Sequence, residues 1–233
     1  MSESEETSEA GLHFLLHRPA GHVGIGRAWP LLLYLHGRGE VGIGRTSLQR
    51  VKTKGSPPHL ATLGKLEGFV VVSPQNPMDP TIVAKTDRAW EPAASRLAGL
   101  MRELLRRKEL GIDRQRIYAI GYSMGGKGLV HLVSILPLFA AWVAVDSQPG
   151  WKRSDAHAAA ETPAWVAYGS NKKCRESGME LATVLRECSK REVVEVDVGL
   201  ADHVKVATLV FSGSSTHKGQ DIYQWLWDHK RAS

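Results

Sequence analysis

A short apolar run followed by closely spaced glycines is the feature that most constrains the fold of this chain. Residues 116–127 read RIYAIGYSMGGK, in which Ile117–Ile120 have the composition of a buried strand and the residues after Gly125 resume at helical spacing. Gly121 and Gly125 frame Ser123, two positions away on each side, and only residues without a side chain let a strand and a helix approach closely around a sharp turn. The pattern therefore predicts a strand, a tight turn with Ser123 at its apex, and a helix.

A serine at the apex of a strand-to-helix turn is exposed in the way that a nucleophile requires. The bare G-x-S-x-G pattern is weak, because it also occurs by chance. Its place between a buried strand and a helix makes it specific, and the alternative is a glycine-rich turn without chemistry. We favour the catalytic interpretation of Ser123.

The composition is that of an ordinary globular chain. Of its 233 residues 42% are hydrophobic, which is enough for the core of one domain. The two cysteines, Cys174 and Cys188, make no C-x-x-C motif or disulfide framework, and no apolar stretch reaches the length of a membrane span, so we expect a cytoplasmic protein. The net charge of +6 is dispersed except at 106–108, which we assign to a helix end rather than to a nucleic-acid surface. The oligomeric state stays open.

The first ten residues differ from the rest of the chain. Met1–Ala10 are rich in serine and glutamate, so they have too little apolar surface to bury. This composition predicts a disordered acidic tail and leaves residues 11–233 as the folded domain. The alternation within Leu12–Leu16 predicts an edge strand at the start of that domain.

Strand and helix patterns alternate through the remainder of the chain. Apolar runs predict buried strands at 31–36, 69–72, 117–120, 139–145 and 164–168 and an edge strand at 193–198, whereas helical spacing appears at 97–105, 126–136, 175–188 and 222–226. This alternation predicts a single-domain α/β fold with a mostly parallel, doubly wound sheet. Residues 146–163 are too few for a lid domain.

The segment His36–Glu40, which reads HGRGE, has two interpretations. Its glycines and Gly42 formally match the G-x-G-x-x-G fingerprint of dinucleotide-binding proteins, which needs a helix directly after it and an acidic residue after the next strand. The next strand, 69–72, ends in SPQN and supplies no such acid. The alternative is an oxyanion loop, in which a strand ending in His-Gly exposes the backbone NH of Arg38 toward the nucleophile. We favour this loop because Ser123 needs one, and we expect neither a cofactor nor a metal.

Several separated motifs occur in a fixed order along the chain: LHGRGE, VVSPQ, IDRQRIY, GYSMGG and IYQWL. Together they resemble the α/β-hydrolases of the carboxylesterase and "predicted peptidase" type, which are phospholipase-carboxylesterase-like, and the likeness covers residues 29–230. The resemblance implies Ser123 as nucleophile, His203 as base, and the amides of Arg38 and Met124 as the oxyanion hole. It also implies a small-molecule ester as the substrate.

The acid of the expected triad departs from the family pattern. In the family the strand that corresponds to 164–168 runs into G-x-x-D, but here Lys172 stands in place of the aspartate. Asp146 is our first substitute, because it ends the preceding strand at the same edge of the sheet, although a loop cap explains it equally well. Glu176 on the next helix is a further candidate, whereas Asp202, beside His203, points the wrong way to orient it.

Two functions of different classes follow from these patterns. The first is a serine esterase in which Ser123 attacks an ester carbonyl and His203 transfers the proton. The second is a decayed hydrolase that serves as a binding or scaffold module, which Lys172 and the unusual sequence Val204–Val206 after the histidine suggest. We favour the enzyme, because the serine turn and the oxyanion loop occur together.

Overall fold

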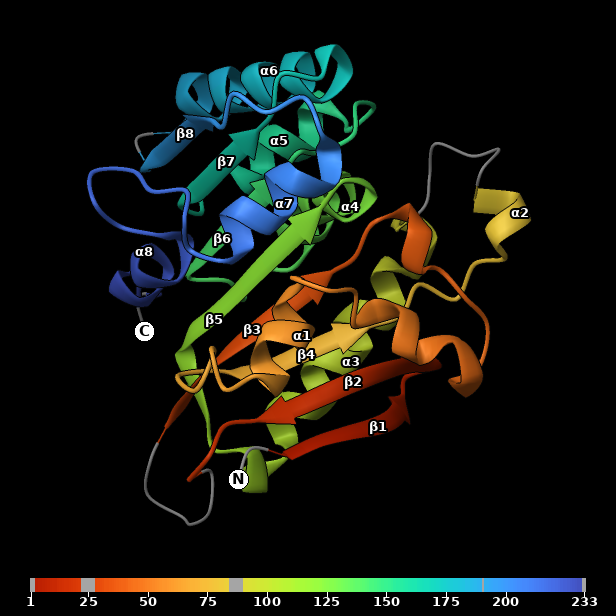
Figure 1. Cartoon of the computed structure of the whole chain (residues 1–233). Helices are drawn as coiled ribbons and strands as arrows, with labels where there is room; N and C mark the ends of the chain where they lie inside the picture. The colour runs from red at the N-terminus through yellow and green to blue at the C-terminus, as the bar shows by residue number, and fades with distance from the viewer. Residues whose placement is uncertain (1–2, 22–27, 84–89, 190, 232–233) are drawn as a thin grey trace.

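An eight-stranded, mostly parallel sheet forms the centre of the molecule (Figure 1). The computed structural model describes residues 3–21, 28–83, 90–189 and 191–231. In space the strands follow the order β1-β2-β4-β3-β5-β6-β7-β8; β1 with β2 and β2 with β4 are antiparallel, and the other pairs are parallel. The strands are β1 Glu3–Glu9, β2 Leu12–Arg18, β3 Trp29–Leu35, β4 Val70–Pro74, β5 Ile112–Tyr122, β6 Ala141–Val145, β7 Ala164–Tyr168 and β8 Val193–Asp197.

Helices cover both faces of this sheet. The α-helices are α1 Pro57–Thr62, α2 Pro80–Val83, α3 Ala94–Arg106, α4 Met124–Ile135, α5 Arg153–Ala159, α6 Lys172–Cys188, α7 His203–Phe211 and α8 Ile222–Asp228, and the short 3₁₀ helices are η1 Arg38–Glu40, η2 Arg45–Val51, η3 Glu91–Ala93 and η4 Lys108–Leu110. One core cluster joins α3, α4, α5 and α6 to the sheet, and the other joins η2, α1, α7 and α8 to its opposite face (Figure 1). The predicted doubly wound α/β fold is confirmed.

The continuous apolar character of the central strands follows from this layered arrangement. Along β3, Leu31, Leu33 and Leu35 belong to one core cluster, whereas Leu32 and Tyr34 belong to the other. Successive side chains of a strand point to opposite faces, so a strand covered on both faces needs apolar residues at every position. Within the described ranges, no helix combines the length and the apolar character that crossing a bilayer requires. Residues 146–163 hold only α5 and no lid domain.

The expectation of a disordered tail at the N-terminus is wrong. Residues 3–9 form β1, which pairs antiparallel with β2 along its whole length, so β2 is an inner strand rather than the predicted edge. Ala10 and Gly11 have φ values of 52° and 73°, as the tight turn between two such strands requires. The glutamates find cationic partners: Glu6 lies 3.1 Å from Arg45, and Glu9 lies 2.9 Å from Arg107. Backbone pairing thus orders a segment whose composition alone predicts disorder, and the folded domain begins before residue 11.

Candidate active site

Ser123 lies at the sharp turn between β5 and α4, as the sequence predicts. Its φ of 55° and ψ of −116° are unusual for a residue with a side chain. The flanking glycines allow this turn because a side chain at either one would collide with backbone: a Cβ at Gly121 would overlap the carbonyl of Gly125, and one at Gly125 would overlap the carbonyl of Leu35. The G-x-S-x-G spacing is therefore a steric requirement of the turn.

Backbone hydrogen bonds join this turn to the loop after β6. The amide of Ser123 donates to the carbonyl of Val145 at 2.9 Å, and the amide of Gln148 donates to the carbonyl of Ser123 at 3.1 Å. Asp146 lies between these two contacts, with a φ of 45° and a fully buried side chain. Its Oδ1 accepts a hydrogen bond from the amide of Gly169 at 2.9 Å. The position of the carboxylate is thus fixed by the two neighbouring strands.

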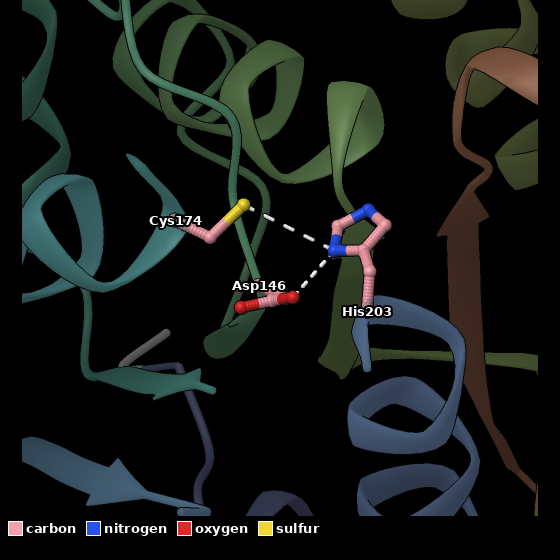
Figure 2. A group of neighbouring side chains, drawn as sticks. All are labelled: Asp146, Cys174 and His203. Carbon is pink, nitrogen blue, oxygen red and sulfur yellow. Dashed lines mark hydrogen bonds and ion pairs between the residues drawn. The ribbon is translucent and has the colours of Figure 1, made fainter. Parts of the chain in front are cut away.

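His203 begins α7 and meets Asp146 directly. Asp202 caps this helix by accepting hydrogen bonds from the amides of Val204 and Lys205, each at 3.0 Å, so the expectation that Asp202 does not orient the histidine agrees with its contacts. The Nδ1 of His203 is hydrogen-bonded to the Oδ2 of Asp146, and the second ring nitrogen points away from that carboxylate (Figure 2). Because an ionised carboxylate only accepts, Nδ1 carries the hydrogen.

The carboxylate also affects the pKa of the histidine ring. Burial by itself disfavours the charged ring, but the hydrogen bond and the negative charge of Asp146, together with the contact of the Cys174 thiol, outweigh it and raise the pKa of His203 to about 9. The ring of Tyr122 lies 4.8 Å from that of His203, and the Tyr122 hydroxyl donates to the His203 backbone carbonyl at 3.3 Å. An imidazolium at this position is therefore stabilised by its surroundings.

The structure brings a cysteine to the same histidine. Cys174, which the sequence reasoning treated as a loop residue, lies in the first turn of α6, and its Sγ is 3.9 Å from the Nδ1 of His203 (Figure 2). Asp146, Cys174 and His203 each offer one atom of a kind that binds metal ions, and these three atoms lie within 4.8 Å of one another. A metal there would have to displace the hydrogen bond between Asp146 and His203. Lys172, at the expected position of the acid, and Glu176 are exposed on α6.

The segment that carries Arg38 is held by buried groups around His36. The Nδ1–H of His36 donates to the carbonyl of Gly37 at 2.6 Å, its Nε2 accepts from the amide of Asn76 at 2.9 Å, and burial lowers the pKa of this ring to about 4. The ring is therefore neutral near pH 7, and its approach to Glu40 is not an ion pair. Arg38 opens η1, as Met124 opens α4, and amides at the start of a helix have no intrahelical acceptor.

Sequence reasoning assigned no role to Glu40, although it belongs to the HGRGE motif. Its side chain is buried, its Oε1 accepts a hydrogen bond from the hydroxyl of Thr53 at 3.1 Å, and burial raises the pKa of its carboxyl group. Its backbone carbonyl accepts from the side chain of Gln75 at 2.8 Å. These contacts join the loop that carries Arg38 to Thr53, which follows η2, and to Gln75, which follows β4. The sequence contains no signal for Thr53, which lies in a weakly patterned region.

Ser123 and His203 line one cavity of about 710 Å³. Its other lining residues come from the Arg38 loop, from η2 and the segment after it, and from α7: Arg38, Gly39, Glu40, Arg50, Thr53, Lys54, Gly55, Ser56, Tyr122, Gln148, Val204, Ala207, Thr208 and Phe211. A cavity of this size accommodates a small organic molecule. The structure therefore brings a serine, a histidine that contacts a buried carboxylate, and Arg38 at the start of η1 to one cavity.

Solved structures of known proteins share this architecture. A dienelactone hydrolase from Anabaena variabilis aligns with a TM-score of 0.66 and 16% identity over 99% of this chain and 99% of its own. An esterase from Rhizomucor miehei aligns with a TM-score of 0.65 and 15% identity over 89% of this chain and 77% of its own. A thermostable esterase aligns with a TM-score of 0.63 and 21% identity over 99% of this chain. The alignment spans only 63% of that protein. No family model and no curated protein sequence gives a significant match.

A doubly wound sheet in which a strand, a sharp turn bearing a serine and a helix follow one another defines a class of α/β domains. The neighbouring structures identify the fold within this class: the chain has the α/β-hydrolase fold. The likeness to the carboxylesterase type that the sequence motifs indicate is confirmed at the level of the fold.

Proposed function

We propose that this protein is a serine hydrolase that cleaves small carboxylic esters through an acyl-enzyme intermediate. The observation that supports it most is the pairing of His203 with the buried carboxylate of Asp146 in a cavity that Ser123 also lines. A serine hydroxyl is a poor nucleophile unless an imidazole accepts its proton, and a carboxylate on the other ring nitrogen keeps that imidazole in the required tautomer.

In the proposed reaction, the Oγ of Ser123 attacks the ester carbonyl carbon while its proton passes to the Nε2 of His203. The amides of Arg38 and Met124 donate hydrogen bonds to the negatively charged oxygen of the tetrahedral intermediate. The intermediate collapses, and His203 returns the proton to the departing alkoxide, which leaves as the alcohol. Water then repeats these steps on the acyl-enzyme and releases the carboxylic acid. No step requires a cofactor or a metal ion.

The interpretation as a binding module loses its main support. It depended on the lysine at the expected acid position and on the unusual sequence Val204–Val206, and the contact of Asp146 with the Nδ1 of His203 supports another carboxylate in the role of that acid. The cytoplasmic location and the ester as the only partner stay predictions.

An active-site probe tests the proposed nucleophile. A fluorophosphonate should label the wild-type protein and should fail to label Ser123→Ala. Ser134→Ala is the matched control, because Ser134 lies on α4 with its hydroxyl bonded to the carbonyl of His131 and is not among the residues that line the cavity. Labelling of Ser123→Ala equal to that of the wild type would show that the nucleophile lies elsewhere.

A further inference from the structure

The cavity beside Ser123 has two walls of different chemistry. One wall is apolar: Val204, Ala207 and Phe211 follow one another at helical spacing along α7, and Val204 is 60% exposed. The opposite wall is formed by the Arg38 loop and by η2 with the segment after it. Gly55 of that segment approaches the side chain of Thr208 on α7, so the two walls meet at one end of the cavity.

Three cationic side chains, Arg38, Arg50 and Lys54, line the second wall. All three are exposed, and among the described residues none of them lies within ion-pair distance of a carboxylate. Arg38 only reaches the amide oxygen of Gln148, at 3.5 Å. Some arginines elsewhere on the surface do lie within ion-pair distance of a carboxylate: Arg45 lies 3.1 Å from Glu6, and Arg175 lies 3.1 Å from Asp197. Cations without an acidic partner are thus gathered at the cavity.

The single carboxylate of the lining does not balance these charges. Glu40 is buried, and its Oε1 is occupied by the hydroxyl of Thr53. Burial also raises the pKa of its carboxyl group, and one carboxyl group is outnumbered by three cationic side chains in either protonation state. The cavity therefore has a positive wall in a chain whose net charge is +6, and such a field concentrates anions at the site.

We propose that the substrates are esters that carry an anionic oxygen group, a carboxylate or a phosphate-type group, at the far end of an apolar chain. This proposal rests on the proposed esterase function and specifies its substrate class. The apolar part of the ester contacts the α7 wall while its ester group reaches Ser123. The anionic end contacts Arg50 and Lys54, since a guanidinium binds such oxygens through two parallel N–H groups and an ammonium binds them as a point charge.

The test compares two methyl esters that differ only in the group at the end remote from the ester. Monomethyl adipate carries a free carboxylate where methyl hexanoate carries a methyl group, and methanol release measures the turnover of both. We expect kcat/KM to be at least about tenfold higher for the anionic ester at low ionic strength, and the preference to shrink as salt is added. A third methyl ester, with a phosphonate in place of the carboxylate, shows which anionic group the wall prefers. A preference ratio near one for both anionic esters would overturn the proposal.

Variants link this preference to the cationic wall. Arg50→Gln combined with Lys54→Gln should lower the ratio of the two kcat/KM values by about tenfold. Lys52→Gln is the matched control, because Lys52 follows η2 but lines a separate small cavity beside β2, and the ratio should stay as in the wild type. If the double variant kept the full ratio, or if Lys52→Gln lost it equally, the assignment of the wall would be wrong.

A binding measurement separates this proposal from the proposed function. If the wild type hydrolyses none of these esters, the esterase assignment fails for them, but the anion site is still tested by calorimetric titration of Ser123→Ala with monomethyl adipate. Binding that weakens about tenfold in the Arg50→Gln, Lys54→Gln background supports the anion site. Absence of binding, or equal binding of methyl hexanoate, overturns it.

Discussion

Replacing Asp146 by asparagine tests the carboxylate that we propose as the acid of the triad. The substitution removes the negative charge of a side chain with 0% exposure while keeping its size, and the asparagine oxygen can still accept the hydrogen bond from the amide of Gly169. Fold and melting temperature should therefore change little. The asparagine NH₂ group, however, faces the Nδ1 of His203 and favours the tautomer with hydrogen on Nε2, which cannot accept the proton of Ser123.

The expected loss follows from both effects of this substitution. The wrong tautomer and the lost stabilisation of the imidazolium together should lower kcat for a p-nitrophenyl ester by about 10³ to 10⁴, which corresponds to about 4 to 5.5 kcal/mol of activation free energy. The pH profile adds an independent readout. The rate of the wild type should rise with pH toward the pKa of about 9, because only the neutral ring accepts a proton, and the inflection should move to lower pH in Asp146→Asn.

A matched control makes the loss specific to the site. The Oδ2 of Asp155 lies 2.9 Å from the Nδ1 of His131, so Asp155→Asn disturbs a similar aspartate–histidine pair that is not among the residues lining the cavity, and it should leave the rate unchanged. A loss below about tenfold in Asp146→Asn would refute the reasoning. A gain of rate in Lys172→Asp would also refute it, because Nδ1 of His203 is already occupied.

Three further predictions follow from the same geometry. His203→Ala should lose ester turnover by several powers of ten while staying folded, whereas His217→Ala, whose ring packs against Trp165, should keep its turnover; kinetics with both variants checks this. Gly125→Ala should destabilise the protein by about 1–3 kcal/mol or more in denaturant unfolding, because its Cβ would overlap the carbonyl of Leu35. The raised pKa of His203 stabilises the fold below pH 6.5 and loses this effect as pH rises toward 9, so wild type and His203→Ala should converge in unfolding free energy over that range.

Local patterns predicted the fold well because the residues of each strand themselves indicate which of its faces are buried. The continuous apolar runs of β3 and β6 and the helical spacing of α3 each follow from the faces that they bury. The disordered tail was predicted wrongly for the opposite reason. β1 is ordered because it pairs with β2, and the composition of residues 1–10 says nothing about whether such a partner strand lies beside them.

The candidate site was predicted unevenly for a related reason. The serine turn is a local steric motif, so Ser123 could be placed from its glycines alone. The contact between Asp146 and His203 joins residues 57 positions apart, and the sequence offered Asp146 only as one candidate because several carboxylates stood at plausible distances along the chain. Cys174 and Thr53 carry no local signal, and only the packing of α6 and η2 against the site brings them into contact with it.

The position of Asp146 on the loop after β6 has a consequence for the loop after β7. That loop supports Asp146 through the main-chain amide of Gly169, and the residues that follow, 170–171 of the loop and 172–173 at the start of α6, are all exposed. A side chain at Gly169 would overlap the carbonyl of Leu200, whereas residues 170–173 are exposed, so the stretch after Gly169 is a point at which the chain tolerates exchanged or added residues. For an engineer it is an insertion point from which a new rim or lid can be built over the cavity while the serine, the histidine and the carboxylate keep their places.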